Sequence, residues 1–506
     1  MNQTPSPAIE GSGSLLVVDQ GSHASKAIVY AGDGRPAAEA EVPVATAHPA
    51  PGWAEHDAES LLASVDAAIR QVCAGLTRNL RPAVAGLATQ RSTLVCWHAG
   101  TGQPLSPAIS WQDRRNAGWL EDLELDPEQV REITGLVPTP HYGASKFRWC
   151  LDHLPDVAAA RRDGQLRMGP LSSFLTARLA NVPGPGRGAG SVDAPVVDPA
   201  NASRTLLWDV GRRDWSDSLL ARFGLTRELL PRCVASRYDH GTLATPDGPV
   251  PLAVCTGDQP ATLFASGRPD PDAIYVNLGT GAFLQRLAGS EPTPGGMLRS
   301  VCWQDGERVM QVHEGTVNGA GAALSWLARR EATREQALFD GAPAWLAREK
   351  DPPLFVNGVG GLGAPFWIPD CRVGFDRTAS LPARTVAIIE SIVFLLQANI
   401  DALGTAGTPP ARIVVSGGLA RLDGLCQRLA DLSGLRVERL GDVEATALGV
   451  AWLLRHDPGS PGGSLDATPR AEPATRFEPG ANPGLAARYR KWRTLLSDRV
   501  AGPAGR

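Results

Sequence analysis

The 506 residues are too many for one hydrophobic core, so the length predicts two or three domains, and two large ones are favoured. With 43% hydrophobic residues, 20% charged residues and a net charge of −4, the composition is that of a globular protein and offers no basic surface for nucleic acid. The eight cysteines form no Cys-x-x-Cys pair, so we expect neither a zinc site nor disulfides. The N-terminus lacks the build of a signal peptide and no apolar run approaches the roughly 20 residues of a membrane span, so we expect a cytoplasmic protein outside the membrane.

The first predicted elements are two β-rich runs within 17–30, which reads VVDQGSHASKAIVY. An acid, a glycine and small hydroxyl residues join them, and no helix pattern follows the glycine. Further strands are predicted at 84–90, 93–99 and 252–255. The last of these runs into a helix at Asp258, a position that exposes a carboxylate at the rim of an α/β sheet.

A second strand-turn-strand unit is predicted within 273–287, which reads AIYVNLGTGAFLQRL. It follows the first by about half the chain, which suggests an internal duplication, although two unrelated hairpin turns would give the same pattern. Glycine lets the backbone approach an anion closely, so each turn could present N–H groups and a hydroxyl to phosphate. Neither turn is a Walker loop, because Gly-x-x-x-x-Gly-Lys-Ser/Thr is absent and a strand follows.

The C-terminal part begins with a predicted strand at 412–418, which ends in two glycines and is followed by helical leucine spacing. Residues 457–483 are rich in proline and glycine and are interpreted as a linker or a wrapped tail. The run 485–496, LAARYRKWRTLL, is predicted to be a docking helix whose basic face is most simply solvated.

Several motifs in this order resemble the FGGY carbohydrate kinases, and within that family the glycerol kinases. They are VDQGS (18–22), PGWAEHD (51–57), TQRSTLVCW (89–97), ISWQDRR (109–115), SKFRWCLDH (145–153), NASRT (201–205), TGDQPATLF (256–264), LGTGAF (278–283), GLGAPFW (361–367), VSGG (415–418) and EATALG (444–449). The resemblance implies an α/β fold of two actin-like, ribonuclease H-like ATPase domains with ATP and substrate in an interdomain cleft that closes on binding. The expected domains are 14–265, 266–460 and a tail at 461–506 with a terminal helix.

The resemblance also assigns roles. Asp258 would be the general base that accepts the proton of a polyol hydroxyl, although an aspartate at such a join is often only a helix N-cap. Asp19 would hold Mg²⁺ through water together with Asp258, since phosphates would repel a bare carboxylate; an Asx-turn is the alternative. The expected substrate residues are Arg91, Ser92, Trp111, His141, Asp258, Gln259 and Phe283. The expected ATP residues are Gly21, Ser22, His23, Gly279, Thr280, Gly281, Gly321, Ser325, Gly417 and Gly418.

Four positions depart from the glycerol kinase pattern. Ser92 stands where a glutamate is usual, His141 replaces a tyrosine, and His23 replaces a threonine in the first turn. Leu422 stands where an asparagine is expected after the late glycines, which leaves the adenine contacts open at this position. Trp111 could also be an ordinary core aromatic residue.

Three functions remain open at this stage. The first is ATP-dependent phosphorylation of a terminal hydroxyl of a small polyol, with glycerol favoured. The second is an FGGY kinase for another sugar or polyol, such as a pentulose or tetritol, which Ser92 and His141 favour. The third is an actin- or Hsp70-like ATPase, against which the polyol-pocket residues argue. The expected partners are ATP, Mg²⁺ and a small polyol or sugar, in a homodimer or homotetramer.

Overall fold

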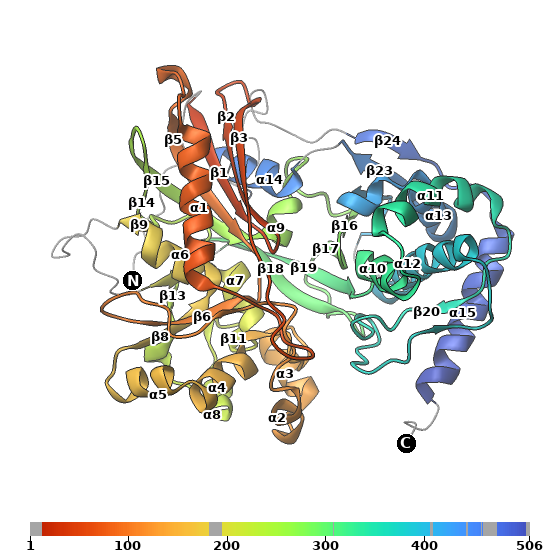
Figure 1. Cartoon of the computed structure of the whole chain (residues 1–506), viewed down its shortest axis with the longest axis horizontal. Coiled ribbons are helices and arrows are strands. Elements are labelled where there is room, and N and C mark those ends of the chain that lie inside the picture. The colour runs from red at the N-terminus through yellow and green to blue at the C-terminus, as the bar shows by residue number, and fades with distance from the viewer. Residues whose placement is uncertain are drawn as a thin grey trace. The chain divides into compact units, whose positions relative to one another are not determined.

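The structure is a computed structural model that describes residues 13–181, 195–306, 308–404, 408–441, 444–456, 458 and 473–501 (Figure 1). Contacts divide the chain into two compact units. The first comprises Met1–Arg268, Ser300–Gln311 and Glu444–Ala471, and the second comprises Pro269–Arg299, Val312–Val443 and Glu472–Arg506. Each unit has its own sheet and its own hydrophobic core.

The first unit is built on a seven-stranded sheet in the order β3-β2-β1-β5-β15-β14-β9. Its strands are β1 (Ser14–Gln20), β2 (Ala24–Tyr30), β3 (Pro36–Pro43), β5 (Pro82–Thr89), β9 (Ala180–Asn181), β14 (Thr242–Thr245) and β15 (Gly248–Gly257). The pair β1–β2 is antiparallel, while β5 runs parallel to both β1 and β15. Strand β1 is almost wholly buried, as its run of leucine and valine predicts.

A second seven-stranded sheet has the order β18-β19-β17-β16-β22-β23-β24. Its strands are β16 (Ala273–Leu278), β17 (Ala282–Ala288), β18 (Leu298–Asp305), β19 (Arg308–Val317), β22 (Arg412–Ser416), β23 (Arg436–Leu440) and β24 (Pro473–Phe477). Strands β16, β17, β22, β23 and β24 belong to the second unit, whereas most of β18 and the first part of β19 fall within Ser300–Gln311, which are grouped with the first unit. The pair β16–β17 is antiparallel, and β22 runs parallel to both β16 and β23.

The two sheets share one topology. In each sheet, five strands follow the same order when they are numbered along the chain: β3-β2-β1-β5-β15 in the first and β19-β17-β16-β22-β23 in the second. In both sheets the first strand along the chain, β1 or β16, is antiparallel to the next strand and parallel to its other neighbour. The two glycine turns occupy the same place, between the first and second strands of each sheet. This agreement supports the internal duplication over two unrelated hairpins.

Short strands and helices complete both units. A small four-stranded sheet joins β4 (Glu55–His56), β7 (Ala108–Ile109), β6 (Leu94–His98) and β8 (Leu166–Pro170). The helices of the first unit include α1 (Ala58–Cys73), α4 (Gly143–His153), α5 (Pro155–Arg162), α6 (Leu171–Leu179), α9 (Asp258–Thr262) and α14 (Ala445–Arg455). Those of the second unit include α10 (Gly321–Arg330), α11 (Glu335–Arg348), α12 (Leu381–Leu403), α13 (Asp423–Ser433) and α15 (Pro483–Ala501).

Helix α14 comes from the end of the chain but packs in the first unit, against β1, β5 and α9. The approach is so close that a Cβ atom on Gly449 would lie 1.8 Å from the carbonyl oxygen of Ala261 in α9. A Cβ atom on Gly86 of β5 would lie 2.4 Å from a methyl carbon of Val450. Glycine at both positions therefore permits this packing.

Helix α12 corrects one expectation from the sequence. Its 23 residues include an 18-residue window with a mean hydropathy of 1.7, which is long and apolar enough to cross a membrane, although no such segment was expected. However, 89% of that window is buried within the protein, where the helix forms the centre of the second unit's core.

The predicted docking helix is present as α15, at the C-terminal end of the described chain (Figure 1). Its Trp492 is fully buried, and the indole Nε1 donates a hydrogen bond of 2.9 Å to the carbonyl of Phe355. Most of the proline- and glycine-rich stretch before it lies outside the described residues.

Candidate active site

The first glycine turn is fixed by a polar network rather than left open. The Gly21 N–H donates to the carbonyl of Ala24 at 2.9 Å. The Ser22 hydroxyl donates to Oε1 of Gln90 at 3.1 Å and accepts from the indole Nε1 of Trp111 at 2.9 Å. Because this hydroxyl is already engaged, a phosphate at the turn would be held by backbone N–H groups. His23, the remaining predicted residue of the turn, is exposed.

Asp19 and Asp258 interact electrostatically within the first unit. Asp19 lies near the end of β1, and Asp258 follows directly on β15. Burial, followed by the negative charges of Asp258 and Glu444, raises the pKa of Asp19 to about 7. Burial also raises the pKa of Asp258, while the charge of Arg91 opposes that shift. The N-cap of α9 is Gly257 rather than Asp258, so the capping interpretation of this aspartate does not hold.

The surroundings of Asp19 suit a cation. Its Oδ1 atom is buried and has no hydrogen-bond partner among the described residues. Across the β1–β2 pair Lys26 lies opposite Asp19 in register, but its ammonium is 2.7 Å from Glu444, 3.1 Å from Glu41 and 3.3 Å from Glu39. Lys26 therefore shares its charge among three other carboxylates. Mg²⁺ is usually bound by oxygen ligands that include one or two carboxylates, and Asp19 and Asp258 offer two carboxylates, one of them with an oxygen that lacks a hydrogen-bond partner among the described residues.

Sequence reasoning missed four residues around Asp19 and the first glycine turn, namely Lys26, Gln90, Glu444 and Thr446. Lys26 lies in β2, shortly after the first turn, and Gln90 lies in the TQRST motif. Glu444 begins the EATALG motif, and Thr446 of the same motif hydrogen-bonds Asp19. The motifs were visible, but no role followed from their sequence alone.

Four predicted substrate residues belong to neighbouring parts of the first unit. Arg91 is 6% exposed, and its side-chain stem packs on Gly257, where a Cβ atom would lie 2.5 Å from it. His141 Nδ1 lies 3.2 Å from the carbonyl oxygen of Trp111. Ser92 has a φ of 63°, an unusual backbone angle for a serine. Trp111 is only partly buried, so it is not simply a core aromatic residue.

Gln259 keeps a polar atom available. Its backbone N–H donates to Oδ1 of Asp258 at 2.8 Å, and its amide Nε2 lies 3.5 Å from Oδ2 of the same carboxylate. Its Oε1 atom is buried without a hydrogen-bond partner among the described residues. Such an acceptor fits a substrate hydroxyl.

The second glycine turn brings several predicted phosphate residues together in the second unit. The Gly279 N–H donates to Gly281 at 2.9 Å, and Gly321, the first residue of α10, donates to Gly279 at 3.0 Å. A Cβ atom on Gly321 would lie 2.9 Å from the Gly279 carbonyl oxygen. Thr280 is exposed at the tip, whereas the Ser325 hydroxyl is occupied by Glu335 at 2.5 Å.

The late glycines are exposed after β22. Gly417 has a φ of 90°, and a Cβ atom there would lie 2.6 Å from the carbonyl oxygen of Leu278. No heavy atom would lie within 4 Å of a Cβ on Gly418. Leu422 is 1% exposed and lies in the hydrophobic core of the second unit.

The predicted residues thus divide between the two units. Asp19, the first turn, Arg91, Ser92, Trp111, His141, Asp258 and Gln259 belong to the first unit, and the second turn, Phe283, Gly321, Ser325, Gly417 and Gly418 belong to the second. Phe283 is partly buried on β17.

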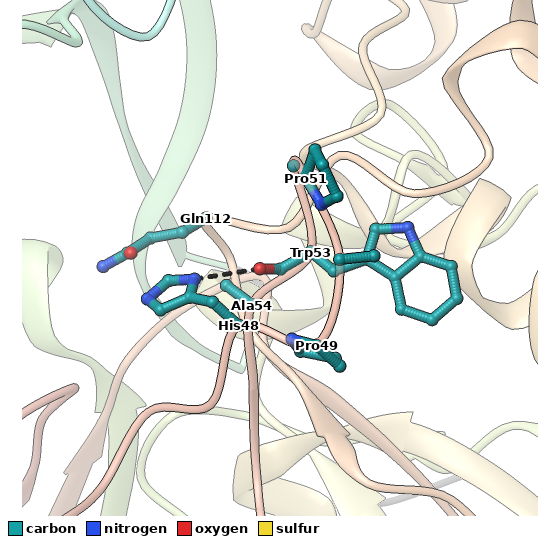
Figure 2. Close-up of a pocket in the computed structure, with 8 residues that line it drawn as sticks. His48, Pro49, Pro51, Trp53, Ala54 and Gln112 are labelled. Carbon is teal, nitrogen blue, oxygen red and sulfur yellow. Dashed lines mark hydrogen bonds between the residues drawn. The ribbon is translucent and has the colours of Figure 1, made fainter.

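A separate hollow of about 540 Å³ lies beside the Trp111 loop in the first unit (Figure 2). Residues 48–54 and Gln112 line it, and His48 Nδ1 lies 2.9 Å from the carbonyl oxygen of Trp53. None of the site residues predicted from the sequence is among its lining residues.

Comparison with known proteins finds related kinases. A glycerol kinase of Alkalilimnicola ehrlichii is 35% identical over 484 residues, which cover 92% of this chain and 94% of that protein. The crystal structure of a Plasmodium falciparum glycerol kinase with ADP superposes with a TM-score of 0.82 at 20% identity, covering 97% of this chain and 99% of the other. A xylulose kinase from Rhodospirillum rubrum superposes with a TM-score of 0.80 at 19% identity, covering 96% and 98%. These two likenesses show a common fold.

Two family models cover most of the chain. The N-terminal domain of the FGGY family of carbohydrate kinases matches residues 14–265, and the C-terminal domain of the same family matches residues 274–455. Together with two sheets of one topology, each with a glycine turn between its first two strands, these matches make the chain a member of the FGGY family of carbohydrate kinases.

Proposed function

We propose that this kinase transfers the γ-phosphoryl group of ATP to a terminal hydroxyl of glycerol, giving glycerol 3-phosphate. The observation that carries the proposal is the placement of Asp258 at the carboxyl end of β15, next to the buried acceptor Gln259 and in electrostatic contact with Asp19. The 35% identity with a glycerol kinase over nearly the whole chain supports the substrate.

In this proposal Asp258 accepts the proton of the attacking hydroxyl. A base works best when its pKa lies near the working pH, and burial moves the pKa of Asp258 upward in that direction. The charge of Arg91 opposes this rise in the pKa of Asp258. Arg91 and Gln259 orient the polyol hydroxyls, with Ser92 and His141 as further polar groups and Trp111 and Phe283 as apolar faces.

The nucleotide is assigned to both glycine turns. Backbone N–H groups around Gly21, Ser22 and His23 and around Gly279, Thr280 and Gly281 would hold phosphate oxygens, while Gly417 and Gly418 leave room for the adenosine. Gly321 supports the second turn, and Ser325 lies one helical turn further on. Asp19 and Asp258 would hold Mg²⁺ through water, and when bound the ion would neutralise charge on the transferred group. All eight cysteines are free thiols, which suits a reducing cytoplasm.

A kinase for a longer polyol or a ketose is the second candidate, and Ser92 and His141 favour it. A glutamate at position 92 could accept two hydrogen bonds as a charged group, whereas serine offers one short neutral hydroxyl. Replacing a tyrosine by His141 leaves further room. The neutral form of His141 dominates, because burial lowers its pKa to about 4.

A substrate panel tests the proposal. Purified protein is assayed with glycerol, erythritol, ribitol, xylitol, xylulose, ribulose and gluconate, and kcat/KM is compared. Glycerol is expected to rank first; another compound that exceeds it tenfold, a difference of about 1.4 kcal/mol, would replace it as the substrate. Asp258→Asn is expected to lower kcat by about 10²–10⁴-fold with nucleotide binding retained, and near-normal turnover would refute the role of the base.

A further inference from the structure

A lysine that is not part of the proposed reaction lies at the centre of the substrate-binding segments. Lys146 is in the first turn of α4, yet it is 0% exposed. Its Nζ donates to the carbonyl oxygen of His141 at 2.7 Å and to that of Ser110 at 2.8 Å, and lies 3.5 Å from that of Ser92. Fully buried lysines are rare and need partners, and here main-chain carbonyls accept from the ammonium.

The three carbonyls come from three separate segments. Ser92 is in the loop between β5 and β6, Ser110 directly precedes Trp111, and His141 is in the loop before α4. These segments carry three of the residues to which we assign the polyol. Two further contacts link the same segments, since the Trp111 N–H donates to Thr93 Oγ1 at 3.1 Å and His141 Nδ1 lies 3.2 Å from the Trp111 carbonyl.

The backbone at Ser92 gives a reason why such a support is needed. Its φ of 63° lies in the left-handed region, which a serine adopts only when surrounding contacts hold it. A charged donor at the carbonyl of this residue is one of those contacts.

We propose that Lys146 is a positioning residue for the polyol pocket, which fixes the relative placement of Ser92, Trp111 and His141 without touching the substrate. The inference rests on the proposed function for the identity of the substrate, but the geometry that it describes exists in the protein without ligand. Misplacing such groups by about 1 Å costs roughly 10- to 100-fold in activity.

The proton count of Lys146 adds a pH dependence. An ammonium has three N–H donors for three carbonyls, whereas a neutral amine has two. Burial lowers the pKa of Lys146 to about 7; the charge of Asp113 opposes this shift and that of Arg115 reinforces it. Asp113 is itself bound by Arg115 at 2.8 Å, and the neighbouring His141 is mainly neutral. Above neutral pH one carbonyl therefore loses its donor, and polyol binding weakens.

The experiment compares Lys146→Met, Lys146→Arg and a matched control, Arg237→Met. Methionine keeps the approximate volume and removes the donors, while arginine keeps the charge. Arg237 is another buried cation on main-chain carbonyls, and it donates to those of Leu453, Leu454 and His456 at the C-terminal end of α14. KM for glycerol, KM for ATP, kcat and the thermal midpoint are measured between about pH 6 and pH 8.5.

Lys146→Met is expected to raise KM for glycerol about tenfold or more at pH 6.5, while KM for ATP stays within twofold of wild type. In this variant KM for glycerol should no longer rise with pH. Lys146→Arg should recover part of the affinity, and Arg237→Met should lower only the thermal midpoint. A glycerol KM within twofold of wild type in Lys146→Met, or an equal rise in both KM values, overturns the proposal. If Lys146→Met does not fold, the pH dependence of KM for glycerol in the wild-type protein tests the proposal. A wild-type KM for glycerol that does not rise above pH 7 overturns it.

Hydrogen exchange in the ligand-free protein separates this inference from the proposed function. Replacing Lys146 by arginine or methionine should speed exchange in peptides spanning 90–95, 108–114 and 139–143 more than elsewhere in the first unit. Uniform or unchanged exchange overturns the positioning role. Faster exchange confined to these segments, with no polyol in the panel phosphorylated, would refute the glycerol assignment and leave the positioning role intact.

Discussion

Replacing Asp19 by asparagine should stabilise the ligand-free protein at alkaline pH while abolishing its kinase activity. The pKa of Asp19 rises from 3.8 to about 7 in the folded state. Between these values the unfolded chain has released the proton that the folded chain still holds, so the free energy of unfolding falls as pH rises. At about 1.4 kcal/mol per pKa unit, the folded state loses up to about 4 kcal/mol between pH 4 and pH 8. Asparagine carries no such penalty.

Urea unfolding of wild type, Asp19→Asn and a control, Asp163→Asn, measures this effect at pH 4.5, 6 and 8 without ligands. Asp163 is exposed at the end of α5, so its replacement should leave the pH dependence unchanged. Asp19→Asn should gain stability over wild type progressively from pH 4.5 to pH 8, and Mg²⁺ with ATP should narrow the gap by binding wild type alone. If both proteins lose stability in parallel over this range, the assignment of Asp19 as the destabilised carboxylate is refuted.

Three further substitutions test other parts of the site. Ser92→Glu should lower KM for glycerol by about 3- to 10-fold by supplying a charged acceptor, and an unchanged KM would count against a contact at this position. Gly449→Ala places a Cβ atom 1.8 Å from the Ala261 carbonyl oxygen, so α14 must shift away from α9. We expect the free energy of unfolding in urea to fall by about 1–3 kcal/mol and kcat to decrease, and an unchanged urea midpoint would contradict this packing. Gly417→Ala, with φ at 90° and Leu278 at 2.6 Å, should raise KM for ATP and leave that for glycerol within twofold, and the opposite pattern would remove Gly417 from the nucleotide site.

The strand-turn-strand units and the strand end at Asp258 were predictable, because local patterns of β-branched residues and glycine determine them. The burial of Lys146 was not predictable, since a lysine two residues before an arginine in SKFRW has the appearance of an exposed helical residue. Its burial depends on carbonyls that distant segments bring to it. For the same reason the sequence suggested that the Ser22 hydroxyl faces phosphate, whereas long-range contacts with Gln90 and Trp111 engage it.

The apolar α12 shows a different limit of pattern analysis. Length and hydropathy describe a helix that is apolar on all sides, but they do not distinguish lipid from protein as its surroundings. Only the strands and helices packed around it settle that α12 is a core helix of the second unit.

The return of α14 to the first unit also has a consequence for biosynthesis. Residues 444–456 leave the ribosome long after strands β1 and β5, which they cover. Until residues 444–456 have been synthesised, the nascent first sheet lacks that cover and exposes apolar surface of the kind that chaperones bind. A chain terminated before Glu444 would keep both glycine turns but would lack the helix packed behind Asp19 and α9, so we expect premature termination products to aggregate rather than persist as a partly active enzyme.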